Sequence, residues 1–211
     1  SPVLGNPPDM KYLQSLCWEH NIELIGDNCD SLGTTIDGTS ITDYYYSWSC
    51  SFYPAHHIST GEGGMVCSND EELIKTARSI SWWGRDCYCV GSSNTLSCGT
   101  CGKRFDYWLN DYDGIVDHKY VFTNMGYNLK PLDLQGAIGL EQLKKVDQID
   151  ILRNQYKNRL DKALKKKEGF TTINTLPGVV PSWFGTPVFC ETPELKEFFV
   201  AHLEANHIQT R

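Results

Sequence analysis

The chain has 211 residues, a net charge of −7, 40% hydrophobic residues and 21% charged residues. This composition is typical of a folded globular protein and excludes a disordered one. The negative charge speaks against nucleic acid or an acidic membrane surface as a partner, because both repel acidic proteins.

The first predicted elements are a helix and a strand that ends next to an aspartate. Residues 8–21 predict an amphipathic helix, because apolar residues recur on one face. Residues 22–26 alternate as in a short strand, and Asp27 follows directly. Ligands of open α/β sheets gather at the carboxyl ends of strands, which makes Asp27 a candidate binding residue. A turn-forming or helix-capping aspartate is the alternative.

A glycine-rich turn follows aromatic, hydroxyl and histidine residues in the segment 51–64. Pro54 fixes its own φ and lacks a backbone donor, and the glycines after it allow bends where a β-carbon would clash. This arrangement holds the preceding side chains in one orientation, which suits a reactive group. Imidazole moves protons near neutral pH, so His56 and His57 are candidates. A tight loop with solvated histidines is the alternative.

Four of the nine cysteines lie close together in the sequence, within residues 85–105. They are Cys87, Cys89, Cys98 and Cys101. The odd total, with no signal peptide and no apolar run of transmembrane length, argues against a secreted disulfide framework and predicts a cytoplasmic protein. Thiolates this close together favour zinc or an iron–sulfur cluster.

The last third of the chain predicts one long helix followed by a small α/β region. Apolar residues recur at three- or four-residue spacing over residues 133–163. Strands are expected at residues 170–173 and 187–190, and a helix is expected at residues 193–205.

The segment 51–64 resembles the cofactor loop of the DegT/DnrJ/EryC1/StrS family of sugar-modifying aminotransferases. Those proteins carry a Ser-Phe-x-x-x-Lys run before a Gly-Glu/Asp-Gly-Gly turn, and the lysine binds pyridoxal phosphate (PLP) covalently. Here Ser51, Phe52 and the turn at residues 61–64 match, while His56 stands at the lysine position. The resemblance implies an α/β fold of the fold-type I PLP-dependent transferases, similar to aspartate aminotransferase.

The histidine in place of the lysine resembles the branch of 3-dehydratases that make 3,6-dideoxysugars. Imidazole cannot form the stable covalent link, so the resemblance implies that the cofactor persists as pyridoxamine 5′-phosphate (PMP). The free amine of PMP can condense with a 4-keto sugar. His56 is then the implied catalytic residue, and His57 is expected to be a supporting or structural histidine.

The resemblance also implies a set of cofactor contacts. Asp27 matches an aspartate that pairs with the pyridinium nitrogen and keeps it protonated. Ser51 matches a serine that contacts the cofactor phosphate. Asn128 matches an asparagine that reaches that phosphate from the neighbouring subunit, which implies a homodimer. Asp30 lies where relatives place a polar side chain beside the cofactor ring.

The cysteine spacing resembles that of CDP-4-keto-6-deoxyglucose-3-dehydrases, which bind a [2Fe–2S] cluster through Cys-x57-Cys-x-Cys-x7-Cys. Here 57 residues separate Cys29 from Cys87, and one residue separates Cys87 from Cys89. The fourth ligand departs from the pattern, because eight residues separate Cys89 from Cys98 and eleven separate it from Cys101. The surrounding sequence favours Cys101, Cys98 remains an alternative, and the Cys-x-x-Cys pair is also typical of zinc sites.

The implied function is PMP-dependent dehydration at C3 of a nucleotide-linked 4-keto-6-deoxyhexose, in 3,6-dideoxysugar (O-antigen) biosynthesis. A [2Fe–2S] cluster passes single electrons, so a flavin- and iron–sulfur-containing, NADH-dependent reductase is implied as a partner. One alternative is a cluster-free enzyme similar to GDP-4-keto-6-deoxymannose-3-dehydratase, which should lack the Cys87 and Cys89 pair. The other is a truncated, non-catalytic relative with a zinc site.

Relatives in the family extend beyond both ends of this chain, which is therefore expected to be an internal piece. Residues 1–133 resemble the C-terminal part of the large cofactor-binding α/β domain, with the cysteine-rich loop at residues 85–105. Residues 134–211 resemble the long linking helix and the start of the small C-terminal domain. The family's early glycine-rich turn, which holds the cofactor phosphate, is absent from these residues.

Overall fold

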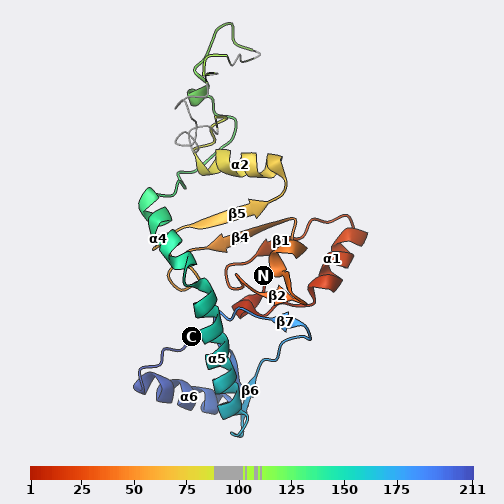
Figure 1. Ribbon diagram of the computed structural model, residues 1–211, viewed down its shortest axis with the longest axis vertical. Helices are drawn as coiled ribbons and strands as arrows, with labels where there is room; N and C mark the ends of the chain where they lie inside the picture. Colours follow the sequence, from red (N-terminus) through yellow and green to blue (C-terminus); the bar gives the residue numbers. More distant parts are fainter. Residues whose placement is uncertain (88–101, 103, 107–108, 110) are drawn as a thin grey trace. The chain divides into compact units, whose positions relative to one another are not determined.

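The computed structural model describes residues 1–87, 102, 104–106, 109 and 111–211. The chain divides into two compact units (Figure 1). The first unit combines residues 1–65 with residues 137–211, and the second is made from residues 66–136. The loop around His56 therefore belongs to the first unit, and the described part of the cysteine-rich loop belongs to the second.

A parallel pair of strands brings two predicted site residues to one edge of a sheet. Strand β1 (Ile25–Asp27) pairs in parallel with β4 (Ser47–Ser51), and Asp27 lies opposite Ser49. Strand β5 (Gly64–Ser68), which begins in the first unit, completes the order β1-β4-β5 (Figure 1). Because parallel strands end on the same side, the residues that follow β1 and β4 are neighbours.

Helix α1 (Met10–Glu19) precedes β1 and confirms the helix expected at residues 8–21. Asp9 caps its N-terminus, and its carboxylate accepts a hydrogen bond from a main-chain amide of the first turn. The strand after it begins at Ile25, later than predicted. The amide of Ile22 still donates to the Cys17 carbonyl of the helix at 2.8 Å. This amide therefore caps the C-terminal end of the helix and cannot also donate to a neighbouring strand.

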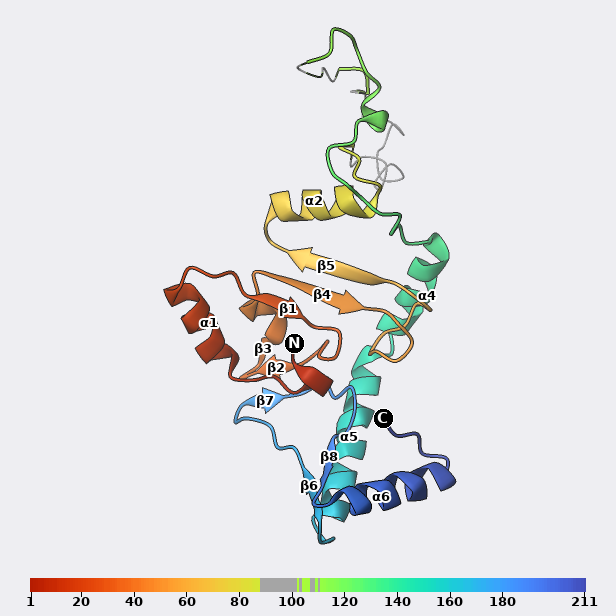
Figure 2. The same ribbon diagram turned by 180° about the vertical axis from the view of Figure 1, so that it is seen from behind.

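A second sheet lies beside α1 and was not predicted from the sequence (Figure 2). Its order is β3-β2-β7, formed by β2 (Thr35–Ile36), β3 (Thr39–Ser40) and β7 (Val179–Val180), and all pairs are antiparallel. Two-residue strands are too short to show an alternating pattern, so the sequence carries no signal for them. The buried hydrophobic cluster next to this sheet consists of Met10, Ile36 and Ile41, the last in the short helix η2 (Ile41–Tyr44).

The long helix expected over residues 133–163 is two helices, and this prediction was wrong. Helix α4 (Asp133–Leu143) ends before α5 (Val146–Leu164) begins. Between them the amide of Lys145 donates to the Gln142 carbonyl at 2.9 Å, which closes a tighter turn than that of an α-helix. The apolar periodicity continues through the junction, so it could not reveal the break.

Two strands and a helix after α5 agree with the sequence. Strand β6 (Phe170–Thr172) pairs antiparallel with β8 (Val188–Cys190), and both lie next to α6 (Pro193–Ala205) and the end of α5 (Figure 2). Thr192 caps α6 by accepting a hydrogen bond from the amide of Leu195 at 3.2 Å. Within the described residues, no helix is both long enough and apolar enough to cross a membrane.

The second unit is built around helix α2 (Glu71–Ser81). Asp70 caps the helix, and Trp82 just after it forms an antiparallel bridge with Asn128. The short helix η4 (His118–Tyr120) lies in the segment that returns from the cysteine-rich loop.

Ion pairs connect the two ends of the cysteine-rich loop to the returning segment. The carboxylate of Asp86 lies 2.6 Å from Nε2 of His118. Arg104, near the other end of the loop, forms a two-point pair with the carboxylate of Asp117. Both ends of the loop are therefore held by neighbouring residues of one segment.

Candidate functional site

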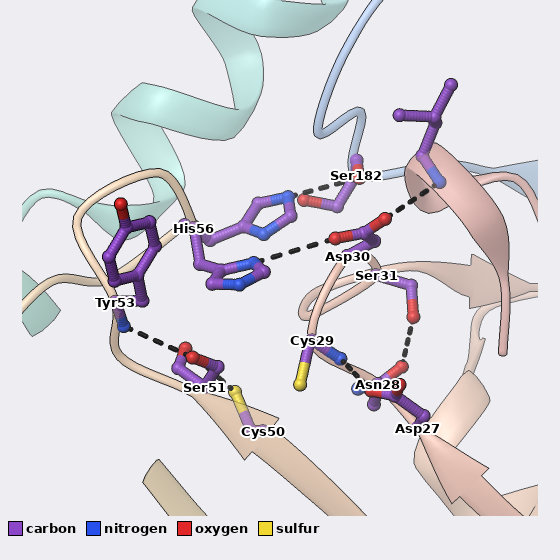
Figure 3. A network of polar contacts seen from close by, with 12 residues as sticks. Asp27, Asn28, Cys29, Asp30, Ser31, Cys50, Ser51, Tyr53, His56 and Ser182 are labelled. Carbon is purple, nitrogen blue, oxygen red and sulfur yellow. Dashed lines mark hydrogen bonds and ion pairs between the residues drawn. The ribbon is translucent and has the colours of Figure 1, made fainter. Parts of the chain in front are cut away.

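The residues after β1 and β4 face one another in the first unit (Figure 3). Asp27 is the last residue of β1, and Cys29 and Asp30 belong to the turn that follows. Ser51 is the last residue of β4, and His56 lies in the loop after it. The structure thus brings together four residues that the sequence predicted for the cofactor site and Cys29, which it predicted as a cluster ligand.

His56 lies between an acidic group and an aromatic ring. Its Nδ1 atom is 3.6 Å from Oδ1 of Asp30, and Figure 3 shows the two side chains pointing toward each other. The imidazole packs against the ring of Phe184, with 5.1 Å between the two ring centroids. The ring of Tyr53 is also close, with its centroid 6.3 Å from that of the imidazole. The Nδ1 atom is buried and has no hydrogen-bond partner within the described residues. An imidazole held beside a carboxylate is suited to carrying a proton.

Asp27 is held in its charged form at the end of β1. Its pKa is lowered, chiefly because its carboxylate accepts a hydrogen bond from the Cys29 thiol, and the Cys29 amide donates to Oδ1 at 3.2 Å. The Cys29 thiol is affected as well. Burial, the larger cause, and the carboxylate of Asp27 raise the pKa of Cys29 to about 11. At neutral pH this pair is therefore a carboxylate beside a protonated thiol.

Ser51 supplies a hydroxyl at the end of β4. Its Oγ atom accepts a hydrogen bond from the Tyr53 amide at 3.2 Å. Because the oxygen acts as acceptor in that contact, the hydroxyl proton can still be donated to an anion. The half-buried position agrees with the phosphate contact that the sequence predicts, which stays a prediction.

His57 is a structural histidine, in agreement with the sequence analysis. Its side chain is buried, and its Nε2 atom lies 3.1 Å from the carbonyl oxygen of Ser182. Burial is the main cause that lowers the pKa of His57, and the nearby Arg153 acts in the same direction. The imidazole is therefore neutral, and its Nε2–H is used to hold the segment around Ser182.

Two other predicted site residues belong to the second unit, and two lie outside the described residues. Asn128 is exposed in the second unit, and Cys87 is buried there. Cys89 and Cys101 lie outside the described residues, as does the alternative ligand Cys98. Their predicted roles stay predictions.

Two ring contacts of His56 were missed by sequence reasoning. Tyr53 lies three residues before His56 within the predicted loop, so its proximity was a signal that could have been used. Phe184 comes from the segment after β7 and has no local mark that connects it with the loop.

The thiols of Cys29 and Cys87 are both free. Among the residues that the structure describes, no group of three or more histidine, cysteine or acidic side chains could hold a metal ion. The predicted cluster requires Cys89 and Cys101 in addition, and these lie outside that part of the chain.

Comparison with known proteins gives close relatives. The sequence is 38% identical over 212 residues to a dTDP-4-dehydro-2,6-dideoxy-D-glucose 3-dehydratase of Saccharopolyspora spinosa, with 99% of this chain and 45% of that protein covered. It is 40% identical over 191 residues to the lipopolysaccharide biosynthesis protein RfbH of Salmonella typhimurium, with 88% of this chain and 42% of that protein covered. The chain thus spans less than half the length of these relatives.

Solved structures agree in fold. The E. coli GDP-4-keto-6-deoxy-D-mannose-3-dehydratase with bound hydrated PLP matches with a TM-score of 0.76 and 25% identity, over 99% of this chain and 50% of that one. An aminotransferase, TlmJ, from Streptoalloteichus hindustanus matches with a TM-score of 0.74 and 20% identity, over 96% of this chain and 48% of that one. These likenesses confirm the predicted fold-type I class. The DegT/DnrJ/EryC1/StrS aminotransferase family matches residues 2–211, and the chain belongs to this family.

Proposed function

We propose that this protein catalyses PMP-dependent dehydration at C3 of a nucleotide-linked 4-keto-6-deoxyhexose, a step toward 3,6-dideoxysugars. The observation that carries the proposal is the position of His56. A histidine, and no lysine, lies beside the carboxylate of Asp30 at the strand ends, with its Nδ1 atom buried and unbonded among the described residues. Two of the similar proteins are named as sugar 3-dehydratases, which supports the reaction class.

The residues at the strand ends fit a bound PMP. A charged Asp27 suits a protonated ring nitrogen, and the Ser51 hydroxyl can donate to a phosphate. Asp30 would lie beside the ring, and Asn128 would reach the phosphate from a neighbouring subunit. When bound, PMP supplies an amine that condenses with a ketone and a ring that takes up negative charge.

His56 is the residue that moves the proton in this proposal. Its imidazole would remove a proton from the C4′ carbon of bound PMP and would give a proton to the C3 hydroxyl group of the sugar, which would then leave as water. The carboxylate of Asp30, with Oδ1 3.6 Å from Nδ1, faces the ring and orients it. Asp27 keeps a negative charge at the strand end throughout, because its pKa is lowered.

The proposed reaction is tested by oxygen exchange with the full-length protein. Reversible dehydration should place solvent oxygen on C3 of CDP-4-keto-6-deoxyglucose when PMP is present in water labelled with heavy oxygen. Mass spectrometry of the recovered sugar measures the exchange, and protein without PMP is the control. Formation of a 4-amino sugar from PLP and glutamate, with no oxygen exchange, would show an aminotransferase instead.

A [2Fe–2S] cluster held by Cys29, Cys87, Cys89 and Cys101 completes the proposal. The donor set fits, since cysteine thiolates are the usual ligands of such clusters, which pass single electrons. Bound iron would displace the proton that Asp27 and burial now keep on the Cys29 thiol. The partner would be a flavin- and iron–sulfur-containing reductase that uses NADH. A cluster-free dehydratase and a zinc-binding relative remain the alternatives.

Iron and sulfide analysis distinguishes these alternatives. We expect about two irons and two sulfides per chain in anaerobically prepared full-length protein, with a reddish-brown colour. Cys101→Ser should bleach the colour, whereas Cys98→Ser, the matched control in the same loop, should keep it. One zinc per chain without labile sulfide would contradict the cluster.

A homodimer is part of the same proposal. Several large apolar side chains near Asn128 are exposed, and a partner subunit would cover them. They are Met125, Tyr127, Leu129, Leu132 and Leu134. We also propose that residues 134–211 are the linking helical segment and the start of the small C-terminal domain.

A further inference from the structure

One residue near the start of the chain holds the groups on both sides of His56. The amide of Leu4 donates to Oδ2 of Asp30 at 3.2 Å, whereas Oδ1 of the same carboxylate faces His56 (Figure 3). The carbonyl of Leu4 accepts a hydrogen bond from the Phe184 amide at 3.1 Å. Asp30 and Phe184 are the two groups that flank the imidazole. The position of Leu4 therefore affects both.

The turn that contains Leu4 cannot hold its shape by local preference. Leu4 lies in the short helix η1 (Val3–Gly5) with a φ of 58°, a left-handed conformation that is costly for a residue with a side chain. Gly5 follows with a φ of 92°, and a β-carbon there would lie 2.0 Å from the Ser182 carbonyl oxygen. Such a turn persists only where tertiary contacts hold it.

Thr34 provides the contact that joins this turn to the segment carrying Phe184. Its side chain is fully buried. Its Oγ1 atom donates to the Gly5 carbonyl at 3.0 Å and accepts from the Ser182 amide at 2.9 Å. The main-chain groups of Thr34 are used elsewhere, since its amide bonds to Ser31 and its carbonyl accepts from Ile41. The Thr34 hydroxyl therefore gives the two segments a second connection, beside the direct bond from the Phe184 amide to the Leu4 carbonyl.

We propose that Thr34 is a positioning residue for His56: its hydroxyl fixes the distance between the Leu4 turn and residues 182–184, and so the orientation of the imidazole between Asp30 and Phe184. The inference rests on the proposed function of His56. Without the hydroxyl, the buried Gly5 carbonyl and Ser182 amide would lose this partner, and the segments would separate or shift to find another. The bond from His57 to the Ser182 carbonyl would remain, so the segment would stay attached but less ordered.

The test compares Thr34→Val, Thr34→Cys and Thr34→Ser with the wild type. Valine keeps the shape and removes the hydroxyl, cysteine offers a weak donor, and serine keeps the hydroxyl while losing a methyl group. Thr42→Val is the matched control: Thr42 lies in the short helix η2, and among the described residues its hydroxyl hydrogen-bonds to that of Ser40, the N-cap of this helix. In every measurement below, Thr34→Ser should stay closest to the wild type, Thr34→Cys should be intermediate, and Thr34→Val should differ most.

The first measurement is made on the cofactor-free protein. We expect the rate of His56 modification by diethyl pyrocarbonate, followed by mass spectrometry, to rise roughly three- to tenfold in Thr34→Val and to stay at the wild-type value in Thr34→Ser and Thr42→Val.

The second measurement is stereoselective deuterium exchange at C4′ of bound PMP, which should become less selective in Thr34→Val. In turnover, kcat should fall about tenfold to hundredfold while KM changes by less than about twofold.

The outcomes separate the two proposals. If wild-type protein shows no C4′ exchange, the proposed function fails, and the modification rates still decide whether Thr34 orders His56. Wild-type modification rates and selectivity in Thr34→Val would overturn the inference. An equal loss in Thr34→Ser would also overturn it, because packing of the methyl group and not the hydroxyl would then be responsible. Should Thr34→Val fail to fold, Thr34→Cys decides between these results.

Discussion

His56→Asn is expected to abolish dehydration while the protein still binds PMP. Removing a positioned general base typically costs about 10²–10⁴-fold in rate, because no other group can move the proton at the same place. Asp30 is a carboxylate beside the ring, but its Oδ2 atom is held by the Leu4 amide. Asp27 and Ser51, the proposed binding residues, are unchanged, so the dissociation constant of PMP should remain close to the wild-type value. Heavy-oxygen exchange at C3 and a PMP titration provide the two measurements.

The control for this substitution is His20→Asn. His20 is exposed at the end of α1, before β1 begins, so its replacement should leave both measurements unchanged. Full exchange in His56→Asn would remove His56 from the mechanism. His56→Lys offers a second arm, because the lysine amine can bind PLP covalently as in the rest of the family, which should produce a visible absorption band.

Asp27→Asn should weaken cofactor binding and slow the reaction, each by about tenfold to hundredfold, the range that a hydrogen bond to a charged group contributes. Because the pKa of Asp27 is lowered, the wild-type carboxylate stays ionised to a lower pH than an ordinary aspartate. It loses its charge only at acidic pH. Asparagine can still accept a hydrogen bond from the Cys29 amide but carries no charge to stabilise a protonated ring nitrogen. A PMP titration and the C3 exchange rate measure the effect.

Asp37→Asn is the matched control for the loss of one negative charge. Asp37 pairs with Lys11 at 2.6 Å on the surface, where such an ion pair contributes little because solvent screens it. The substitution should therefore change neither the PMP titration nor the exchange rate. If Asp27→Asn behaved in the same way as Asp37→Asn, the assignment of Asp27 to the ring nitrogen would be wrong.

Residues of the site that lie close together in the sequence could be predicted from it. Asp27, Cys29 and Asp30 follow one strand, and Ser51 and His56 follow the next parallel strand. Turn chemistry acts over a few residues, so Pro54 and the glycines after it marked the loop without knowledge of the fold. Pro8 and Asp9 marked the start of the first helix for the same reason.

Other features had no local signal. The break between α4 and α5 lies inside a continuous apolar pattern, because both helices use the same periodicity. Strand β7 pairs with β2 across a long stretch of chain and is only two residues long.

The surroundings of His56 depend on contacts between distant segments. Phe184 reaches the imidazole because the Leu4 carbonyl and the Thr34 hydroxyl hold residues 182–184 beside the strand ends. Nothing in the sequence near Leu4 or Thr34 indicates which amide each will bind, since any main-chain donor has the same chemistry. Local chemistry therefore placed the catalytic candidate in a loop, and packing between segments far apart in the chain gave that residue its neighbours.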